Sequence, residues 1–131
     1  MEILEALPPD LTGAESRTLA EAIVRVMDAR KAADIRLMHV EAQTVLTEYF
    51  VLATGHSSTQ VKALAGEIEY RLGQSGVNPD HVEGVDGASW ILMDYGPVIV
   101  HIFTDETRRF YNLEKLWADA GEEDITALLT D

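Results

Sequence analysis

The sequence contains no cysteine and few basic residues. Because cysteine is absent from all 131 residues, disulfides and thiolate metal sites are excluded. Only ten Lys and Arg residues stand against 23 Asp and Glu residues, which gives a formal net charge of −13 at pH 7. Nucleic-acid binding draws most of its affinity from cationic side chains that neutralise phosphates. We therefore expect no direct nucleic-acid binding, and the acidity suits either a basic protein partner or solubility alone.

Long apolar runs and a basic leader are also missing. No segment approaches the ~20 apolar residues that a membrane-spanning helix needs. The N-terminal stretch, MEILEALPPDLTG, has no basic region and no long apolar run, which argues against a signal peptide. We therefore expect a cytoplasmic protein that does not cross a membrane. The length of 131 residues and the apolar content of 47% predict one domain with its own core.

Apolar periodicity predicts helices and strands in mixed order. Apolar residues recur at three- and four-residue steps in the predicted helices, and they alternate or run continuously in the predicted strands. The predicted elements are a helix over 16–32, strands over 35–40 and 49–53, a helix over 57–73 that Ser57 caps, a short strand over 82–84, a hairpin over 90–103 and a final helix. The fold class that follows is a single α/β or α+β domain, a mixed β-sheet covered by helices.

The two ends of the chain carry weaker patterns. Pro8 and Pro9 block regular structure within residues 1–15, which we expect to be a variable and loosely held lead-in. The predicted domain occupies residues 16–120. The acidic segment 121–131 has no positive charge, and it is expected to be either a mobile tail or a short docked helix.

The few aromatic residues, 7% of the chain, gather in one stretch. The segment from Trp90 to Trp117 holds both tryptophans and two of the four tyrosines. It predicts a hairpin hinged at residues 95–97 and then an amphipathic helix capped by Thr104 or Asp105. The apolar side of that helix is predicted to comprise Phe110, Leu113, Leu116 and Trp117. A stretch of this composition either builds the core or presents a surface.

Alternation along the first strand of the hairpin divides its side chains between two faces. Trp90, Leu92 and Asp94 point to one face, whereas Ile91 and Met93 point to the other. One face must enter the core and the other is free to contact a partner. The pattern leaves open which face is which.

Two further residues of the hairpin have predicted environments. Tyr95 lies at the turn, and we expect it to be exposed. His101 lies within VIVHIF, a strand that is expected to be buried on at least one side. We expect a structural histidine there, hydrogen-bonded to Asp94 across the hairpin, with a contribution to a partner surface as the alternative.

Four histidines and many carboxylates raise the question of catalysis. The chain contains no HExxH motif and no Gly-Lys-Ser/Thr phosphate loop. The best lead is the junction Gly55-His56-Ser57, where backbone N–H groups between a strand and a helix can hold an anion. A nucleotidyltransferase also needs two or three carboxylates on neighbouring strands to hold Mg²⁺. After the junction, no predicted strand carries an Asp-x-Asp or Asp-x-Glu pair, and Asp94 at the hairpin has no second carboxylate beside it. We therefore prefer a structural turn and helix cap, and expect no catalytic residue, no cofactor and no metal.

Three ordered groups of residues resemble the motifs of one family. The groups are Phe50 to Gly55 with Ser57 and Gln60 to Ala63; Glu83-Gly84, Trp90, Leu92, Asp94 to Gly96 and Val100 to Phe103; and Arg109, Tyr111 to Glu114, Leu116 and Trp117. In this order and spacing they resemble the Iojap-related ribosomal silencing factor family, over residues 16 to 120. His56 stands where the family more often has Asn, and Pro97 stands where it usually has a polar residue.

The resemblance implies a fold and an activity. It implies a nucleotidyltransferase-like fold without the catalytic carboxylates, and a regulator in place of an enzyme. Members of the family bind the large ribosomal subunit through its fourteenth protein. They block joining of the small subunit and so lower translation when nutrients are short. A nucleotide-binding or nucleotidyl-transferring enzyme at the Gly55–Ser57 junction is the alternative, and a homodimer through the sheet face is a third possibility.

The composition of the hairpin agrees with a partner-binding role. Affinity in protein interfaces concentrates in Trp, Tyr and Arg anchors, and truncating one of them costs ~2 kcal/mol or more. The residues predicted to bind the partner are Trp90, Leu92, Met93, Asp94, Tyr95, His101, Arg109 and Tyr111. Trp117, on the apolar side of the final helix, is expected to pack into the core.

Overall fold

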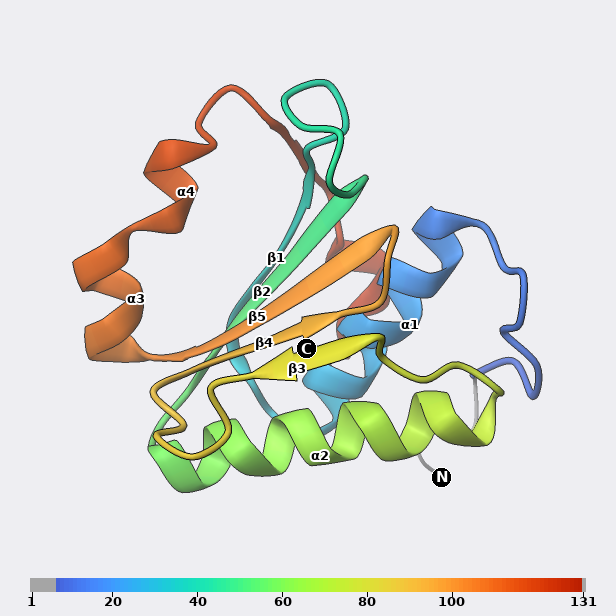
Figure 1. The fold of residues 1–131 in the computed structure, drawn as a ribbon, viewed down its shortest axis with the longest axis horizontal. Coiled ribbons are helices and arrows are strands. Elements are labelled where there is room, and N and C mark those ends of the chain that lie inside the picture. Colours follow the sequence, from blue (N-terminus) through green and yellow to red (C-terminus); the bar gives the residue numbers. More distant parts are fainter. Residues whose placement is uncertain (1–6, 131) are drawn as a thin grey trace.

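The structure, a computed structural model, describes residues 7–130 and consists of one β-sheet flanked by helices (Figure 1). The elements are α1 (Ser16–Ala29), β1 (Ala33–His39), β2 (Tyr49–Gly55), α2 (Ser58–Gln74), β3 (His81–Glu83), β4 (Trp90–Asp94), β5 (Val98–Thr104), α3 (Asp105–Tyr111), α4 (Leu113–Leu116), β6 (Gly121–Glu123) and a 3-10 turn, η2 (Thr126–Leu128). The predicted fold class is confirmed.

The sheet is mixed and has the strand order β3–β4–β5–β2–β1–β6. Within the described residues, β2 and β5 pair in parallel and the other neighbouring strands pair antiparallel. All seven residues of β2 are buried, in agreement with the strand predicted from its continuous apolar run. Because β5 lies between β2 and β4, the β4–β5 hairpin extends the sheet away from its centre.

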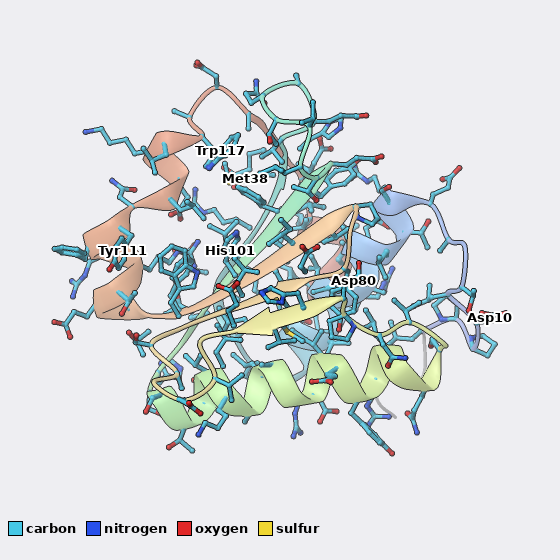
Figure 2. The ribbon with its side chains drawn as sticks, viewed as in Figure 1. Asp10, Met38, Asp80, His101, Tyr111 and Trp117 are labelled. Atoms are coloured by element: carbon cyan, nitrogen blue, oxygen red, sulfur yellow. The ribbon has the colours of Figure 1, made fainter. Side chains whose placement is uncertain are left out.

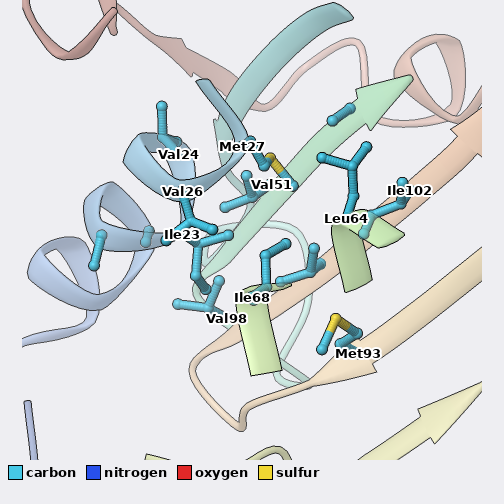
Figure 3. Packing of buried hydrophobic residues seen from close by; sticks show 14 of the residues in the cluster. Ile23, Val24, Val26, Met27, Val51, Leu64, Ile68, Met93, Val98 and Ile102 are labelled. Carbon is cyan, nitrogen blue, oxygen red and sulfur yellow. The ribbon is translucent and has the colours of Figure 1, made fainter. Parts of the chain in front are cut away.

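Helices α1 and α2 cover one face of the sheet and enclose the main core (Figures 1 and 3). The apolar residues that recur at three- and four-residue steps along both predicted helices are buried, for example Ile23 and Val26 on α1 and Ile68 on α2. Burying a side chain of this size stabilises the fold by about 1.5–3 kcal/mol. The predicted cap of α2 is also present, because the Ser57 Oγ accepts a hydrogen bond from the Gln60 N–H at 3.2 Å.

Helices α3 and α4 lie on the opposite side of the sheet over a smaller cluster. The buried residues of this cluster are Met38, Val40, Phe50, Leu52 and Phe103. The prediction of a single final helix is wrong. Asn112 adopts a left-handed conformation, with φ 49° and ψ 58°, and separates two short helices. Phe110 on α3 and Leu116 on α4 are exposed, while Leu113 and Trp117 pack against the cluster, so the four residues do not form one buried side.

Both ends of the described chain are held against the fold. The Leu11 side chain is buried, and its backbone N–H donates to the Ser75 carbonyl at 2.8 Å, so residues 7–15 are not loosely held. Residues 1–6 of the predicted lead-in lie outside the described residues. At the other end, β6 pairs with β1 and Leu128 is buried against the main core. This docked strand was not predicted from the sequence.

Candidate partner-binding face

One face of the β4–β5 hairpin is turned away from the main core and remains partly exposed. The strand register places six side chains on this outer face: Trp90, Leu92, Asp94, Ile99, His101 and Phe103. Trp90, Leu92 and Asp94 are half-buried, whereas Ile91 and Met93 are fully buried on the side of α2. The predicted alternation is therefore confirmed. The structure also settles which face is available, because the Trp90 side is the one that points outward.

Three of the predicted contact residues are buried and do not form part of an exposed surface. Met93 belongs to the main core and is fully buried, because it points to the opposite face from Trp90. The prediction that Tyr95 is exposed is wrong: only 6% of its surface is accessible, since its side chain packs into the main core from the turn. His101 is 4% exposed beneath the outer face.

Aromatic rings connect the outer face to α3 and α4. The Trp90 ring lies 5.0 Å from the Phe103 ring and 5.0 Å from the Tyr111 ring, measured between centroids. The half-buried Trp117 packs edge-on against Phe50 at 5.1 Å. Figure 2 shows Tyr111 on α3, Trp117 at the end of α4 and His101 on the sheet beside these helices. Tyr111 on α3 and Phe103 on β5 thus fix the position of Trp90 at the border of the face.

His101 has a structural role, with a different partner from the one predicted. The Trp90 Nε1–H donates to the His101 Nδ1 at 3.1 Å, so the neutral ring carries its proton on Nε2. Within residues 7–130, the buried Nε2 has no hydrogen-bond partner. Asp94 is not the partner: it pairs with Ile99 in the register, and its Oδ1 accepts from the Gly96 N–H at 2.8 Å. Burial lowers the pKa of His101 to about 4, because the protonated ring would be desolvated.

The free energy of unfolding is expected to fall by about 3 kcal/mol as the pH drops from 6.5 towards 4. Native His101 stays neutral in this window, whereas the unfolded chain, with an ordinary histidine pKa of 6.5, takes up a proton. The stability of the fold that depends on a neutral His101 is complete above pH 6.5 and is lost as the pH falls to 4. Urea unfolding at several pH values measures the free energy of unfolding of the wild type and of His101→Gln. Both proteins contain the other three histidines, so the difference between them reports His101 alone. The same pH dependence in both proteins would contradict the low pKa.

Arg108 is a key residue that the sequence did not single out. It is 6% exposed, and its guanidinium donates to the Glu114 carboxylate at 2.8 and 3.0 Å, to the Thr54 Oγ1 at 2.8 Å and to the Asp34 carbonyl at 2.8 Å. These bonds join α3, α4 and two strands. The predicted contact residue Arg109 differs from it: its side chain is 73% exposed and pairs with Asp105 at 3.3 Å.

A shallow hollow opens beside Trp90 and Leu92. It has a volume of ≈ 250 Å³ and is also lined by Glu83 and Gly84. Gly84 has a φ of 87°, and a Cβ at this position would lie 2.1 Å from the Trp90 carbonyl oxygen. Only glycine allows this close approach of the two backbone segments. The hollow gives the outer face a concave border.

The Gly55-His56-Ser57 junction forms a turn and a helix cap. The Gln60 side chain accepts a hydrogen bond from the His56 N–H, and the Ser57 side chain accepts one from the Gln60 N–H. A Cβ on Gly55 would lie 2.9 Å from the Val61 Cγ2, so glycine is needed for α2 to pack against the end of β2. Two of the N–H groups that an anion would use are therefore already bonded within the chain.

No group of three or more His, Asp and Glu side chains within residues 7–130 is arranged to hold a metal ion. No helix of this part of the chain is long and apolar enough to cross a membrane. The expectations of no cofactor and no catalytic residue stay predictions.

Comparisons with known proteins identify the family. The family model described as "Ribosomal silencing factor during starvation" matches residues 13–131. The ribosomal silencing factor of Bacillus subtilis is 36% identical over 109 residues, which cover 83% of this chain and 92% of that protein. The chloroplastic protein Iojap of Zea mays is 31% identical over 86% of this chain and 51% of its own length. A crystal structure of a protein from Chromobacterium violaceum superposes with a TM-score of 0.77, at 32% identity, over 79% of this chain and 87% of that one. The chain therefore belongs to the ribosomal silencing factor family.

Proposed function

We propose that this chain binds the large ribosomal subunit through its fourteenth protein and thereby blocks joining of the small subunit. The name of the family, a silencing factor during starvation, supports repression of translation under nutrient limitation as the outcome. The observation that carries the proposal is the outer face. There, a strand that is fully buried on one side keeps Trp90 and Leu92 half-exposed on the other.

Five of the predicted contact residues lie at the surface, three of them on the outer face and two on α3. They are Trp90, Leu92, Asp94, Arg109 and Tyr111. Tyr111 is 52% exposed while its ring packs against Trp90, so it extends the aromatic surface from β4 onto α3. Tryptophan, tyrosine and arginine are the side chains in which binding energy concentrates at protein interfaces. Trp90 packs on the cluster beneath it and Tyr111 packs on Trp90, so these two side chains lose little freedom on binding.

Blocking requires affinity and bulk, and it requires no catalytic group. A standard interface covers ~800 Å² of each partner. The accessible surface of the chain is 7084 Å², so such an interface would occupy roughly a ninth of it. The remainder of the domain then projects from the face of the large subunit. We infer that this projecting bulk is what excludes the small subunit.

The charge of the chain favours a protein partner on the ribosome over RNA. The formal net charge of −13 attracts a basic ribosomal protein and is repelled by the phosphates of bare ribosomal RNA. Long-range attraction of this kind raises the association rate and weakens as salt screens it. A homodimer through the outer face stays a prediction, and it would use the same residues as the ribosomal partner.

Saturating amounts of the purified protein are expected to keep isolated large subunits from joining small subunits that are added afterwards. Sedimentation through a sucrose gradient separates intact ribosomes from free subunits, and the protein should travel with the large subunit. Recovery of intact ribosomes at saturating protein would show that joining is not blocked. Co-sedimentation with the small subunit alone would rule out the proposed partner.

A further inference from the structure

A groove beyond the Asp94 end of the outer face lies between the loop that joins β1 to β2 and the turn of the β4–β5 hairpin. Figure 1 shows the loop and the turn at the same end of the sheet, where the Glu48 N–H donates to the Pro97 carbonyl at 3.0 Å. The groove has a volume of ≈ 420 Å³. Its lining residues are Glu41, Thr44, Val45, Leu46, Thr47, Glu48, Gly96 and Pro97.

The loop presents two neighbouring aliphatic side chains to solvent. Val45 is fully exposed and Leu46 is 79% exposed, although both are of a type that proteins usually bury. Single exposed apolar residues are common, but two adjacent ones at the border of a groove form a small apolar patch. The loop is fixed at its base, where the Val40 N–H donates to the Glu48 carbonyl at 2.9 Å. The patch therefore has a defined place beside the groove.

The polar part of the groove is acidic. Glu41 and Glu48 line it, and the Asp94 Oδ1 binds the N–H of the lining residue Gly96. Asp80 lies on the same side, with its Oδ2 3.8 Å from where a Cβ of Gly96 would lie. Across residues 7–130, no Lys or Arg forms an ion pair with any of these four carboxylates. Glu41 is bonded to a histidine, because its Oε1 lies 3.1 Å from the His39 Nε2. The carboxylates of the groove are thus not neutralised by Lys or Arg within the described chain.

We propose that this groove binds a short segment of a protein partner that carries aliphatic and basic side chains. The aliphatic side chains pack on Val45 and Leu46, and the Lys or Arg side chains lie against Glu41 and Glu48. The same carboxylates repel the phosphates of nucleic acids and of acidic lipids, so the charge selects a basic protein segment. The inference does not rest on the proposed function, because it is carried by the groove residues Glu41 to Glu48 and can be tested without ribosomes.

The test uses the free protein and a short peptide of alternating valine and lysine, blocked at both ends. The peptide is expected to shift the backbone amide NMR signals of residues 41–48 and 96, and the shifts should weaken as the salt concentration rises from about 0.05 to 0.5 M. In the double variant Glu41→Lys/Glu48→Lys, affinity for the peptide is expected to fall about tenfold or more. The double variant Val45→Ser/Leu46→Ser should also bind more weakly, because it removes the aliphatic contacts and keeps the charge.

Matched controls make the result decisive. Glu69→Lys/Glu106→Lys changes two exposed carboxylates, on α2 and α3, outside the groove, and it should leave the affinity for the peptide close to that of the wild type. A peptide of alternating valine and glutamate should shift none of the groove signals. The proposal is overturned if the lysine peptide shifts no groove signal, if the glutamate peptide shifts the same signals equally, or if the Glu41→Lys/Glu48→Lys variant binds as well as the wild type.

Discussion

Replacing Arg108 with methionine (Arg108→Met) is expected to lower the free energy of unfolding by about 3 kcal/mol. The substitution removes the guanidinium that binds Glu114 through two N–H groups and also binds the Thr54 hydroxyl and the Asp34 carbonyl. It leaves the Glu114 carboxylate without its cation in a site where its side chain is only 24% exposed. The cost of an unpaired carboxylate in such a site exceeds what the apolar methionine gains by packing, since part of the partner remains desolvated.

The adjacent arginine supplies the matched control. Arg109→Met removes a guanidinium of the same kind, but one that is 73% exposed and pairs with an Asp105 side chain that is 69% exposed. Exposed pairs of this type contribute about 0–1 kcal/mol, so we expect a change of no more than that. Urea unfolding followed by circular dichroism compares the two variants directly. If both lost the same stability, the network around Arg108 would not be what joins α3 and α4 to the sheet.

The two arginines also show where a sequence pattern stops being informative. Arg108 and Arg109 are neighbours of the same type, and the resemblance to the family drew attention to Arg109. Which of them is buried depends on the rotation of α3 about its axis, and the left-handed Asn112 fixes where that helix ends. An amphipathic pattern that continues to Trp117 does not reveal this break. The prediction that Phe110 lies on the buried side fails because α3 turns Arg108, and not Phe110, towards the sheet.

Elements that depend on local signals were predicted correctly. Strand β2 is a continuous apolar run buried throughout, and the Ser57 cap precedes α2 at the expected residue. Alternation along β4 correctly separated the Trp90 side from the Met93 side. These features follow from the spacing of apolar residues within one segment, so they can be recognised without knowledge of the rest of the fold.

Features that depend on distant contacts could not be predicted in this way. Tyr95 is buried because its turn folds back onto the main core, and the short strand β6 exists because β1 has a free edge to pair with. His101 lies opposite Leu92 and not opposite Asp94, which is a matter of register between strands. A sequence shows that these segments are strands, but register and edge pairing are set by the sheet as a whole.

Introducing aspartate at the centre of the outer face (Leu92→Asp) is expected to weaken binding to isolated large subunits by about 100-fold or more. A partner that covers the face would bury the new carboxylate without a cation placed to receive it, which costs several kcal/mol. Leu92 suits this test better than Trp90, whose ring also donates to His101 and packs against Tyr111. Because Leu92 is only half-buried in the free protein, we expect folding to tolerate the change.

An identical substitution elsewhere distinguishes loss of the face from a general effect of added charge. Leu116 lies on α4 and is 76% exposed, so Leu116→Asp adds the same charge away from the outer face. We expect this variant to bind large subunits with nearly the affinity of the wild type, and both variants to unfold at similar urea concentrations. Equal loss of binding in the two variants would show that repulsion by charge, and not burial of Leu92, explains the effect. Full binding by folded Leu92→Asp would place the contact on another surface, because no partner that covers β4 can avoid a carboxylate at its centre.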